Sequence, residues 1–266
     1  MQRTLNRLFF VILSIYIPSA TAITLGEVFI NDPILGARTI VYEKIGDYAV
    51  AEGDILLGRV NILTAKNAVM LPKISGSLWT QGIMPFELGE DLPFPNKLAV
   101  FQAIDLLQKQ TSIRFVELTS LNRHKYPDYV SFTSATGTIC ASHIGRQGGR
   151  QEINLSPRCN TMNTVHEIGH ALGLWHEQSR RDRDSYVRII WDNIEPDHRY
   201  NFDQHLTDSR DYGDYDYQSI MHYPANAFSI NGQQTIVPLF DHVEIGQRRQ
   251  LSEKDIVAIN AMYSDA

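Results

Sequence analysis

This chain contains little cysteine, few long apolar runs and no excess of basic charge. Only two of its 266 residues are cysteine, so at most one disulfide can form within it. No apolar stretch after residue 22 is long enough to span a membrane. The net charge of -6 and the lack of a basic patch with interleaved aromatic residues argue against nucleic acid as a partner. With no evident repeats or low-complexity linkers, the length suits one sizeable domain plus a short extra segment.

Residues 1–22 have the pattern of an export signal. Arg3 and Arg7 form a basic start, residues 8–17 are an apolar run that is short for a membrane span, and residues 20–22 (Ala-Thr-Ala) match a cleavage site. An uncleaved membrane anchor is the alternative, and the short run with its small-residue exit speaks against it. We therefore expect a secreted protein, extracellular or, in a bacterium, periplasmic.

The densest chemical signal is the segment HEIGHALGLWH, which begins at His166. His166 and His170 are four residues apart, so on a helix they project from one face and can share a metal ion. His176 can join them only if the chain turns back, and Gly173 supplies the turn because glycine adopts the left-handed conformation at little cost. Three imidazoles leave one position on Zn²⁺ open to water, and Glu167 is placed to accept its proton. The spacing is that of the metzincin zinc proteases.

A second motif, SIMHYP at residues 219–224, supports the same interpretation. A methionine in a tight turn can lie beneath a zinc site as a polarisable apolar floor, which is the position we assign to Met221. Tyr223 is placed to bring its phenol to the metal or to the oxyanion. We expect His222 to be structural, because three histidines already supply the protein's ligands. The alternative reading, an amphipathic helix with satisfied histidines, becomes weak when both motifs occur together.

The two cysteines, Cys140 and Cys159, bracket a glycine-rich reversal at residues 145–150. Strand-like segments at 129–132 and 153–155 flank this reversal. A disulfide between the cysteines would close a loop just upstream of the zinc helix. In an exported protein this pairing is favoured over two free thiols.

Two weaker motifs carry little chemistry. Asn154 begins a glycosylation sequon, which matters only if the source is eukaryotic. The acidic, tyrosine-rich segment 212–217 lacks the ligand spacing and the terminal glutamate of an EF-hand calcium loop. We therefore predict no calcium site there.

The remaining patterns predict a mixed α and β domain. Residues 95–110 read as a helix with an apolar stripe that we expect to face the core: Leu98, Phe101, Ile104 and Leu107. Residues 113–118 read as a strand, and residues 252–263 as a helix with Ser252 as its N-cap. An extended peptide can pair with an exposed edge strand, for which residues 141–144 are our candidate.

Residues 23–66 form a separate piece upstream of the catalytic segment. Their distinctive feature is Glu52–Asp54 (Glu-Gly-Asp), which follows the strand-like residues 48–50. Alone it would be a surface turn, but a carboxylate upstream of a zinc enzyme can occupy the open metal position and displace the water. We expect Asp54 to cap the zinc until a trypsin-like protease cuts at Lys66-Asn67.

From about Trp79 to Tyr263 the sequence resembles the astacin family of zinc metallopeptidases. Four segments carry the resemblance: HEQSR at 176–180, DRD at 182–184, SIMHY at 219–223 and IGQR at 245–248. Glu177, directly after the third histidine, distinguishes astacins from other metzincins. The resemblance implies an α+β, two-lobed metzincin fold with a twisted mixed sheet and the zinc helix in the upper lobe, and an irregular lower lobe with a C-terminal helix.

The resemblance also implies roles for individual residues. These are zinc ligation by His166, His170 and His176, general base catalysis by Glu167, and the Met-turn at Met221. Tyr223 would be an extra zinc ligand at rest that swings away to stabilise the tetrahedral intermediate, and Glu177 would hold the new N-terminus after activation. Many astacins prefer an acidic residue just after the cut bond. Arg248 or Arg249 could read that residue, and the alternative is that both are solvated surface charges.

The sequence departs from the family pattern in two places. In the inhibitory F-x-G-D motif Asp54 matches, but Ala51 replaces the aromatic residue. Astacins usually have two disulfides, and Cys140–Cys159 matches one of them. The other is absent, because Ser112 and Ser264 occupy its positions.

We therefore predict a zinc-dependent endopeptidase made as a zymogen, with protein or peptide substrates. Residues 1–22 would be the signal peptide, 23–66 the inhibitory propeptide and 67–266 the catalytic domain, a minimal astacin without further modules. A different metzincin protease is one rival, which Glu177 argues against. A catalytically silent zinc-binding or adhesion protein is another, which the intact Glu167 argues against.

Overall fold

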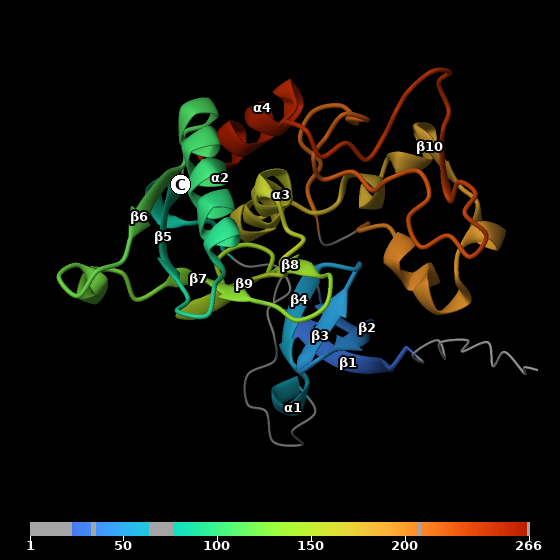
Figure 1. Ribbon diagram of the computed structural model, residues 1–266. Helices are drawn as coiled ribbons and strands as arrows, with labels where there is room; N and C mark the ends of the chain where they lie inside the picture. Colours follow the sequence, from blue (N-terminus) through green and yellow to red (C-terminus); the bar gives the residue numbers. More distant parts are fainter. Residues whose placement is uncertain (1–22, 33–35, 64–76, 207–208, 265–266) are drawn as a thin grey trace, which may run out of the picture.

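The computed structural model describes residues 23–32, 36–63, 77–206 and 209–264 (Figure 1). The expected export signal at 1–22 and the expected cleavage site at Lys66-Asn67 lie outside these ranges. No helix within the described ranges is long and apolar enough to cross a membrane.

A mixed sheet with the strand order β1-β2-β3-β4-β8-β9-β7-β5-β6 is the frame of the described structure. Four strands belong to the predicted propeptide: β1 (Leu25–Asp32), β2 (Gly36–Ile45), β3 (Tyr48–Ala51) and β4 (Ile55–Arg59). Five belong to the catalytic part: β5 (Ile83–Leu88), β6 (Arg114–Glu117), β7 (Tyr129–Ser134), β8 (Cys140–Ser142) and β9 (Arg150–Leu155). The predicted upper-lobe strands are therefore present, and the mixed α+β class is confirmed.

The two groups of strands meet at β8. Strands β1 to β4 form an antiparallel meander, and β4 joins β8 in parallel, with Ile55 opposite Ser142. The Ser142 amide donates to the Asp54 carbonyl oxygen at 2.9 Å. The edge predicted to receive an extended peptide is thus the edge on which the upstream segment lies, because an unpaired edge strand offers its backbone donors and acceptors to another chain.

Two helices cover the catalytic sheet, α2 (Phe94–Gln110) and α3 (Thr161–Leu172), whereas α1 (Val60–Leu63) is one short turn after β4 (Figure 1). The apolar stripe predicted for α2 is wrong in part. Leu98 and Phe101 are 48% and 44% exposed, whereas Val100, Ala103 and Leu107 are buried. Apolar residues occur on several sides of this helix, so the spacing alone did not decide which side faces the sheet.

The C-terminal helix, α4 (Glu253–Met262), packs on the core of the upper lobe rather than in the lower lobe as expected. The Tyr263 hydroxyl donates to the Leu172 carbonyl at the end of α3 at 2.8 Å. The Asn260 side chain accepts from the Ser112 amide at 2.7 Å. These contacts attach the C-terminal end near the place where the second family disulfide is missing. Ser252 caps α4, as the sequence predicts.

The lower lobe, from His176 to Leu251, is built mainly of loops and short 3₁₀ turns. Its only regular pairing among the described residues is a two-stranded sheet of β10 (Val187–Ile189) and β11 (Ile236–Pro238). An apolar cluster around the fully buried Phe202 stabilises this lobe. The irregular lower lobe is therefore as predicted.

The Cys140–Cys159 disulfide forms, with the two Cα atoms 6.0 Å apart. Cys140 is the first residue of β8, the strand on which the upstream segment lies. Cys159 directly precedes the N-cap of α3, so the bridge joins this edge strand to the start of the zinc helix. Asn154 of the sequon is 4% exposed, and its side-chain oxygen accepts from Thr133 at 2.7 Å. The folded chain therefore does not present this asparagine for glycosylation.

Replacing both Cys140 and Cys159 by alanine is expected to lower the free energy of unfolding by about 3 kcal/mol, because the bridge closes a loop of about 19 residues in the unfolded chain. Denaturant unfolding of the full chain measures the change. Reductant added to the unmodified chain should give a similar shift. An unchanged midpoint in both experiments would contradict the prediction.

Candidate metal centre and active site

The helix that carries the metal-binding pattern has well-defined ends. At its start, the Asn160 side chain accepts hydrogen bonds from the amides of Met162 and Asn163, which satisfies donors that the first turn leaves free. At its end, Gly173 adopts φ 111°, and the Leu174 amide donates to the Gly169 carbonyl at 3.0 Å. The chain therefore leaves the helix sharply and brings the third histidine back toward the first two.

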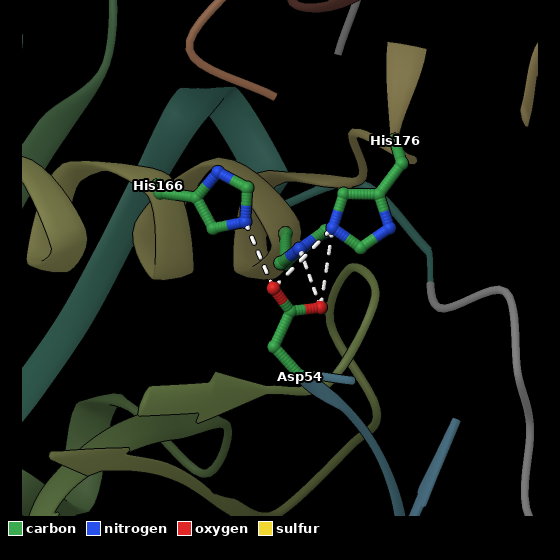
Figure 2. A group of neighbouring side chains, drawn as sticks. Asp54, His166 and His176 are labelled. Atoms are coloured by element: carbon green, nitrogen blue, oxygen red, sulfur yellow. Dashed lines mark hydrogen bonds and ion pairs between the residues drawn. The ribbon is translucent and has the colours of Figure 1, made fainter. Parts of the chain in front are cut away.

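The three histidines converge on Asp54, a residue of the upstream segment. Figure 2 shows two of them, His166 and His176, at the Asp54 carboxylate. The Asp54 carboxylate lies 3.2 Å from Nε2 of His166, 3.5 Å from Nε2 of His170 and 3.2 Å from Nε2 of His176. The four candidate ligand atoms all lie within 4.8 Å of one another. All three imidazoles are buried.

The outer ring nitrogens fix the orientation of each imidazole. Nδ1 of His166 donates to the Ile220 carbonyl and Nδ1 of His170 to the Leu174 carbonyl, both at 2.8 Å. Nδ1 of His176 donates to the Glu52 carboxylate at 2.9 Å. An imidazole that donates through Nδ1 presents the lone pair of Nε2 inward, as a metal ligand requires.

Two buried atoms of this cluster test whether a metal fits. His170 Nε2 and Asp54 Oδ1 are buried and have no hydrogen-bond partner. Such orphaned acceptors are costly unless a cation satisfies them. Three imidazole nitrogens and one carboxylate oxygen are the donors that Zn²⁺ takes in a tetrahedral site. The arrangement fits one zinc ion.

Burial and neighbouring charges shift the pKa values of several groups in the site. Burial lowers the pKa of His166 to about 3, which keeps it neutral and able to ligate. Burial acts to raise the pKa of Asp54, but the histidines, His176 foremost, outweigh it and hold that pKa well below its usual value. Burial, and then the charge of Asp54, raise the pKa of Glu167 well above its ordinary value. Glu167 Oε2 is buried and has no hydrogen-bond partner.

Met221 lies beneath the zinc helix, where a Cβ on Gly169 would come within 2.8 Å of its sulfur. Asp255 holds this turn by accepting from Ser219 Oγ at 2.6 Å and from the Ile220 amide at 2.9 Å. Asp255 lies in the first turn of α4, the helix that the sequence predicts at residues 252–263. Its contact with the Met-turn depends on the packing of α4, which no local pattern reports.

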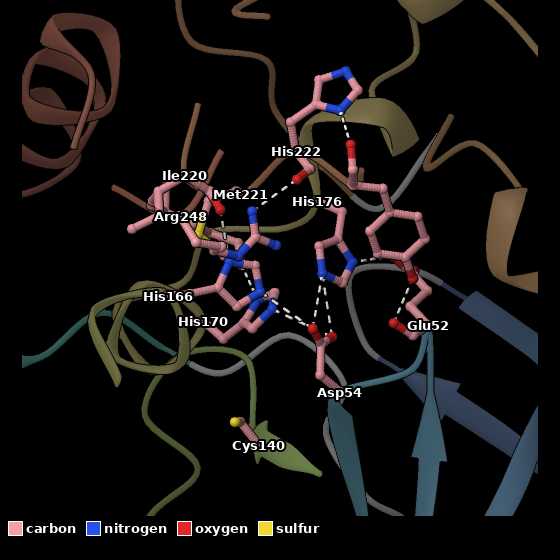
Figure 3. Close-up of polar contacts among 12 residues, drawn as sticks. Glu52, Asp54, Cys140, His166, His170, His176, Ile220, Met221, His222 and Arg248 are labelled. Atoms are coloured by element: carbon pink, nitrogen blue, oxygen red, sulfur yellow. Dashed lines mark hydrogen bonds and ion pairs between the residues drawn. The ribbon is translucent and has the colours of Figure 1, made fainter. Parts of the chain in front are cut away.

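Tyr223 is buried, and its hydroxyl donates to the main-chain oxygen of Glu52 rather than to a group of the histidine cluster. Its ring lies 4.5 Å from that of His176, measured between ring centres. His222 bonds away from the cluster, accepting from Tyr215 at 2.7 Å. In Figure 3, His176 lies at the Asp54 carboxylate, whereas the His222 ring points away from it.

Glu52 is the site residue that sequence reasoning did not single out. Its buried carboxylate accepts from His176 Nδ1, from Ser179 Oγ at 3.2 Å and from His205 Nε2 at 2.5 Å. Burial acts to raise its pKa, but His205 and His176 together lower it well below the usual value. A φ of +47° at this non-glycine residue was the kind of feature that only the structure could reveal.

The two candidate specificity arginines differ in position. The Arg248 guanidinium is largely buried and donates to the His222 carbonyl at 2.9 Å, close to His166 (Figure 3). The Arg249 side chain is 73% exposed and lies 3.9 Å from Glu244. Only Arg248 therefore lies at the site.

Glu177 is half-buried next to the third histidine and borders a pocket of about 220 Å³. Burial raises the pKa of its carboxyl to about 8, although Arg180 acts against this shift from 3.7 Å. One carboxylate oxygen accepts from the Asp216 amide at 2.7 Å. The charge of Arg180 does not cancel the rise in pKa that burial causes. The pocket leaves open space beside the carboxyl group.

Comparison with known proteins decides the family. The family model for astacin, a peptidase family, matches residues 73–264. The chain belongs to the astacin family. The expected family is thereby confirmed, and zinc is the metal of the three-histidine site.

Individual relatives agree with this assignment. High choriolytic enzyme 1 of Oryzias latipes is 37% identical over 248 residues, which are 90% of this chain and 86% of that protein. Its solved structure, described as a hatching enzyme zinc-protease, covers 72% of this chain and 94% of its own with a TM-score of 0.64. Zinc metalloproteinase nas-14 of Caenorhabditis elegans is 38% identical over 75% of this chain, but the match spans only 39% of nas-14.

Replacing Gly173 by alanine is expected to destabilise this astacin-family chain by about 1–3 kcal/mol and to weaken zinc binding. The residue adopts φ +111°, and an added Cβ would lie 3.1 Å from Met262. Thermal unfolding and zinc content measure the two effects. Gly213→Ala is the matched control, since Gly213 also has positive φ but nothing near its added Cβ. Equal loss of zinc in both variants would contradict the turn's role in placing His176.

Proposed function

We propose that this chain is the precursor of a secreted zinc endopeptidase, in which residues 23–66 hold residues 67–266 inactive. The observation that carries the proposal is the Asp54 carboxylate at the convergence of the three zinc-binding histidines. It occupies the position at which a catalytic zinc site keeps water or substrate. Protein or peptide chains are the substrates, as befits a family of peptidases.

Each residue of the site has its own role in hydrolysis. Zinc, when bound by His166, His170 and His176, supplies a Lewis acid for the scissile carbonyl and lowers the pKa of water. Glu167 accepts the proton of the attacking water and passes it to the leaving amine. For this it must be ionised, which the departure of the Asp54 charge favours. The Tyr223 hydroxyl, released from Glu52, donates to the oxyanion.

Latency rests on several contacts of the upstream segment. Asp54 blocks the metal position, β4 occupies the edge of β8, and Gly53 packs against Phe228, where an added Cβ would lie 2.8 Å from the ring. Ala51, which replaces the family's aromatic residue, borders a cavity of about 140 Å³. Glu52 compensates for the missing aromatic anchor through its hydrogen bonds to His176, Ser179 and His205 of the catalytic part.

Activation is a trypsin-like cut at Lys66-Asn67 that frees Asp54 to leave. The new N-terminus then enters the pocket beside Glu177, and its ammonium group adds the positive charge that this carboxyl needs to ionise. The export signal at 1–22 directs the precursor out of the cell. Arg248, beside the histidine cluster, reads an acidic residue after the cut bond, whereas Arg249 is a solvated surface charge.

Replacing Glu167 by alanine is expected to lower kcat/KM for a protein substrate such as casein by at least about 10²–10⁴-fold, because the general base is lost. The assay uses trypsin-treated precursor, with and without a zinc chelator. Zinc content should be unchanged, since Glu167 is not a ligand. An inert wild-type enzyme that binds zinc and is correctly cut would instead favour a silent zinc-binding protein.

Replacing Asp54 by alanine is expected to raise the activity of the uncut precursor at least about tenfold, because the charge-assisted contacts of this carboxylate hold the segment in place. The measured quantity is the ratio of peptidase activity before and after trypsin treatment. Asp47→Ala is the matched control, since Asp47 is an acidic residue of the same segment with an exposed side chain. A variant that remains silent before the cut, yet is active after it, would contradict the role of Asp54.

A further inference from the structure

The Glu52 carboxylate occupies a site whose remaining walls belong to the catalytic part. Besides His176 Nδ1, its donors are Ser179 Oγ at 3.2 Å and His205 Nε2 at 2.5 Å. Neither Ser179 nor His205 is part of the zinc set or of the catalytic residues. Both are buried when Glu52 is in place.

Contacts within the catalytic part position these two donors. The His205 amide donates to the Ser179 carbonyl at 2.8 Å, so the two residues are tied through their backbones. The His205 ring packs on Trp175 with 3.9 Å between ring centres. Arg183 reinforces the arrangement by donating to the carbonyls of Gln178 and Phe202. These contacts position both donors from within the catalytic part.

We propose that Ser179 and His205 form a binding site for an acidic side chain of a bound peptide, which Glu52 fills before activation and a substrate carboxylate fills afterwards. This inference rests on the proposed peptidase function. Removal of the upstream segment takes the Glu52 carboxylate away from both donors, and a second charged acceptor in its place restores the stronger kind of hydrogen bond.

The position suits a residue close to the scissile bond. Glu52 is only two residues from Asp54, whose carboxylate stands at the metal position. Trp175, Tyr200 and His205 of the catalytic part wall the cavity next to Glu52, and they stay when the upstream segment, which forms its other walls, is removed. Asp203 also lines this cavity, and its carboxyl group would repel a substrate carboxylate. An acidic side chain is therefore favoured only where it reaches Ser179 and His205 directly. The site is separate from Arg248, which lies on the His166 side of the cluster (Figure 3).

The test compares peptide pairs that carry glutamate or glutamine at each position within three residues of the cut bond, using trypsin-activated enzyme. At one position the unmodified enzyme should cleave the glutamate peptide with about tenfold higher kcat/KM. His205→Phe, which keeps a ring over Trp175 but lacks the donor, should abolish this preference, so that the glutamate and glutamine peptides are cleaved with similar kcat/KM. His205→Gln, whose amide can donate from a similar place, should retain part of it.

Two controls separate the alternatives. Arg249→Gln removes an exposed cation and should leave the preference intact. If His205→Phe does not fold, Ser179→Ala removes only a hydroxyl and should reduce the preference at the same position. A preference that survives both His205→Phe and Ser179→Ala, or that depends on Arg248 alone, would overturn the inference while leaving the peptidase function standing. No cleavage of either peptide by the unmodified enzyme would overturn both.

Discussion

The structure depends on the burial of one carboxylate among three imidazoles. Asp54 and the Nε2 atoms of the three histidines form a compact set of buried acceptors, two of which have no hydrogen-bond partner. Such a set is unfavourable unless a cation shares it, because buried acceptors repel one another and lose their water. Zinc binding and the docking of the upstream segment are therefore coupled, since each stabilises the groups that the other needs.

The same docking acts on every catalytic group of the proposed mechanism. The Asp54 carboxylate stands at the convergence of the three histidines, and its charge acts to raise the pKa of Glu167. The Glu52 backbone holds the hydroxyl of Tyr223, and β4 occupies the edge strand β8. In the proposed precursor, removing this one segment would release the metal position, the base, the oxyanion donor and the substrate edge together.

Local patterns predicted those features whose cause lies within a few residues. The spacing of His166 and His170 on one helix face and the turn at Gly173 follow from helix geometry, and Ser252 caps α4 as its sequence indicates. The disulfide could be predicted because the chain contains only two cysteines. In α2 the same reasoning misjudged Leu98 and Phe101, because apolar residues surround this helix and only the contact with the sheet selects the buried side. It also left Arg248 and Arg249 undistinguished, although only Arg248 lies beside the histidine cluster.

The residues alone were enough to predict the family and the zinc-binding pattern, because the spacing of the three histidines and the turn at Gly173 has few chemical uses. Asp54 became a candidate only through its position upstream of that motif. The shared site of Glu52, the support of the Met-turn by Asp255 and the packing of α4 on the upper core became visible only in the folded chain. Glu52 and His205 are 153 residues apart, and Ser219 and Asp255 are 36 apart. Contacts over such separations arise from the packing of whole elements, which no periodicity in the sequence encodes.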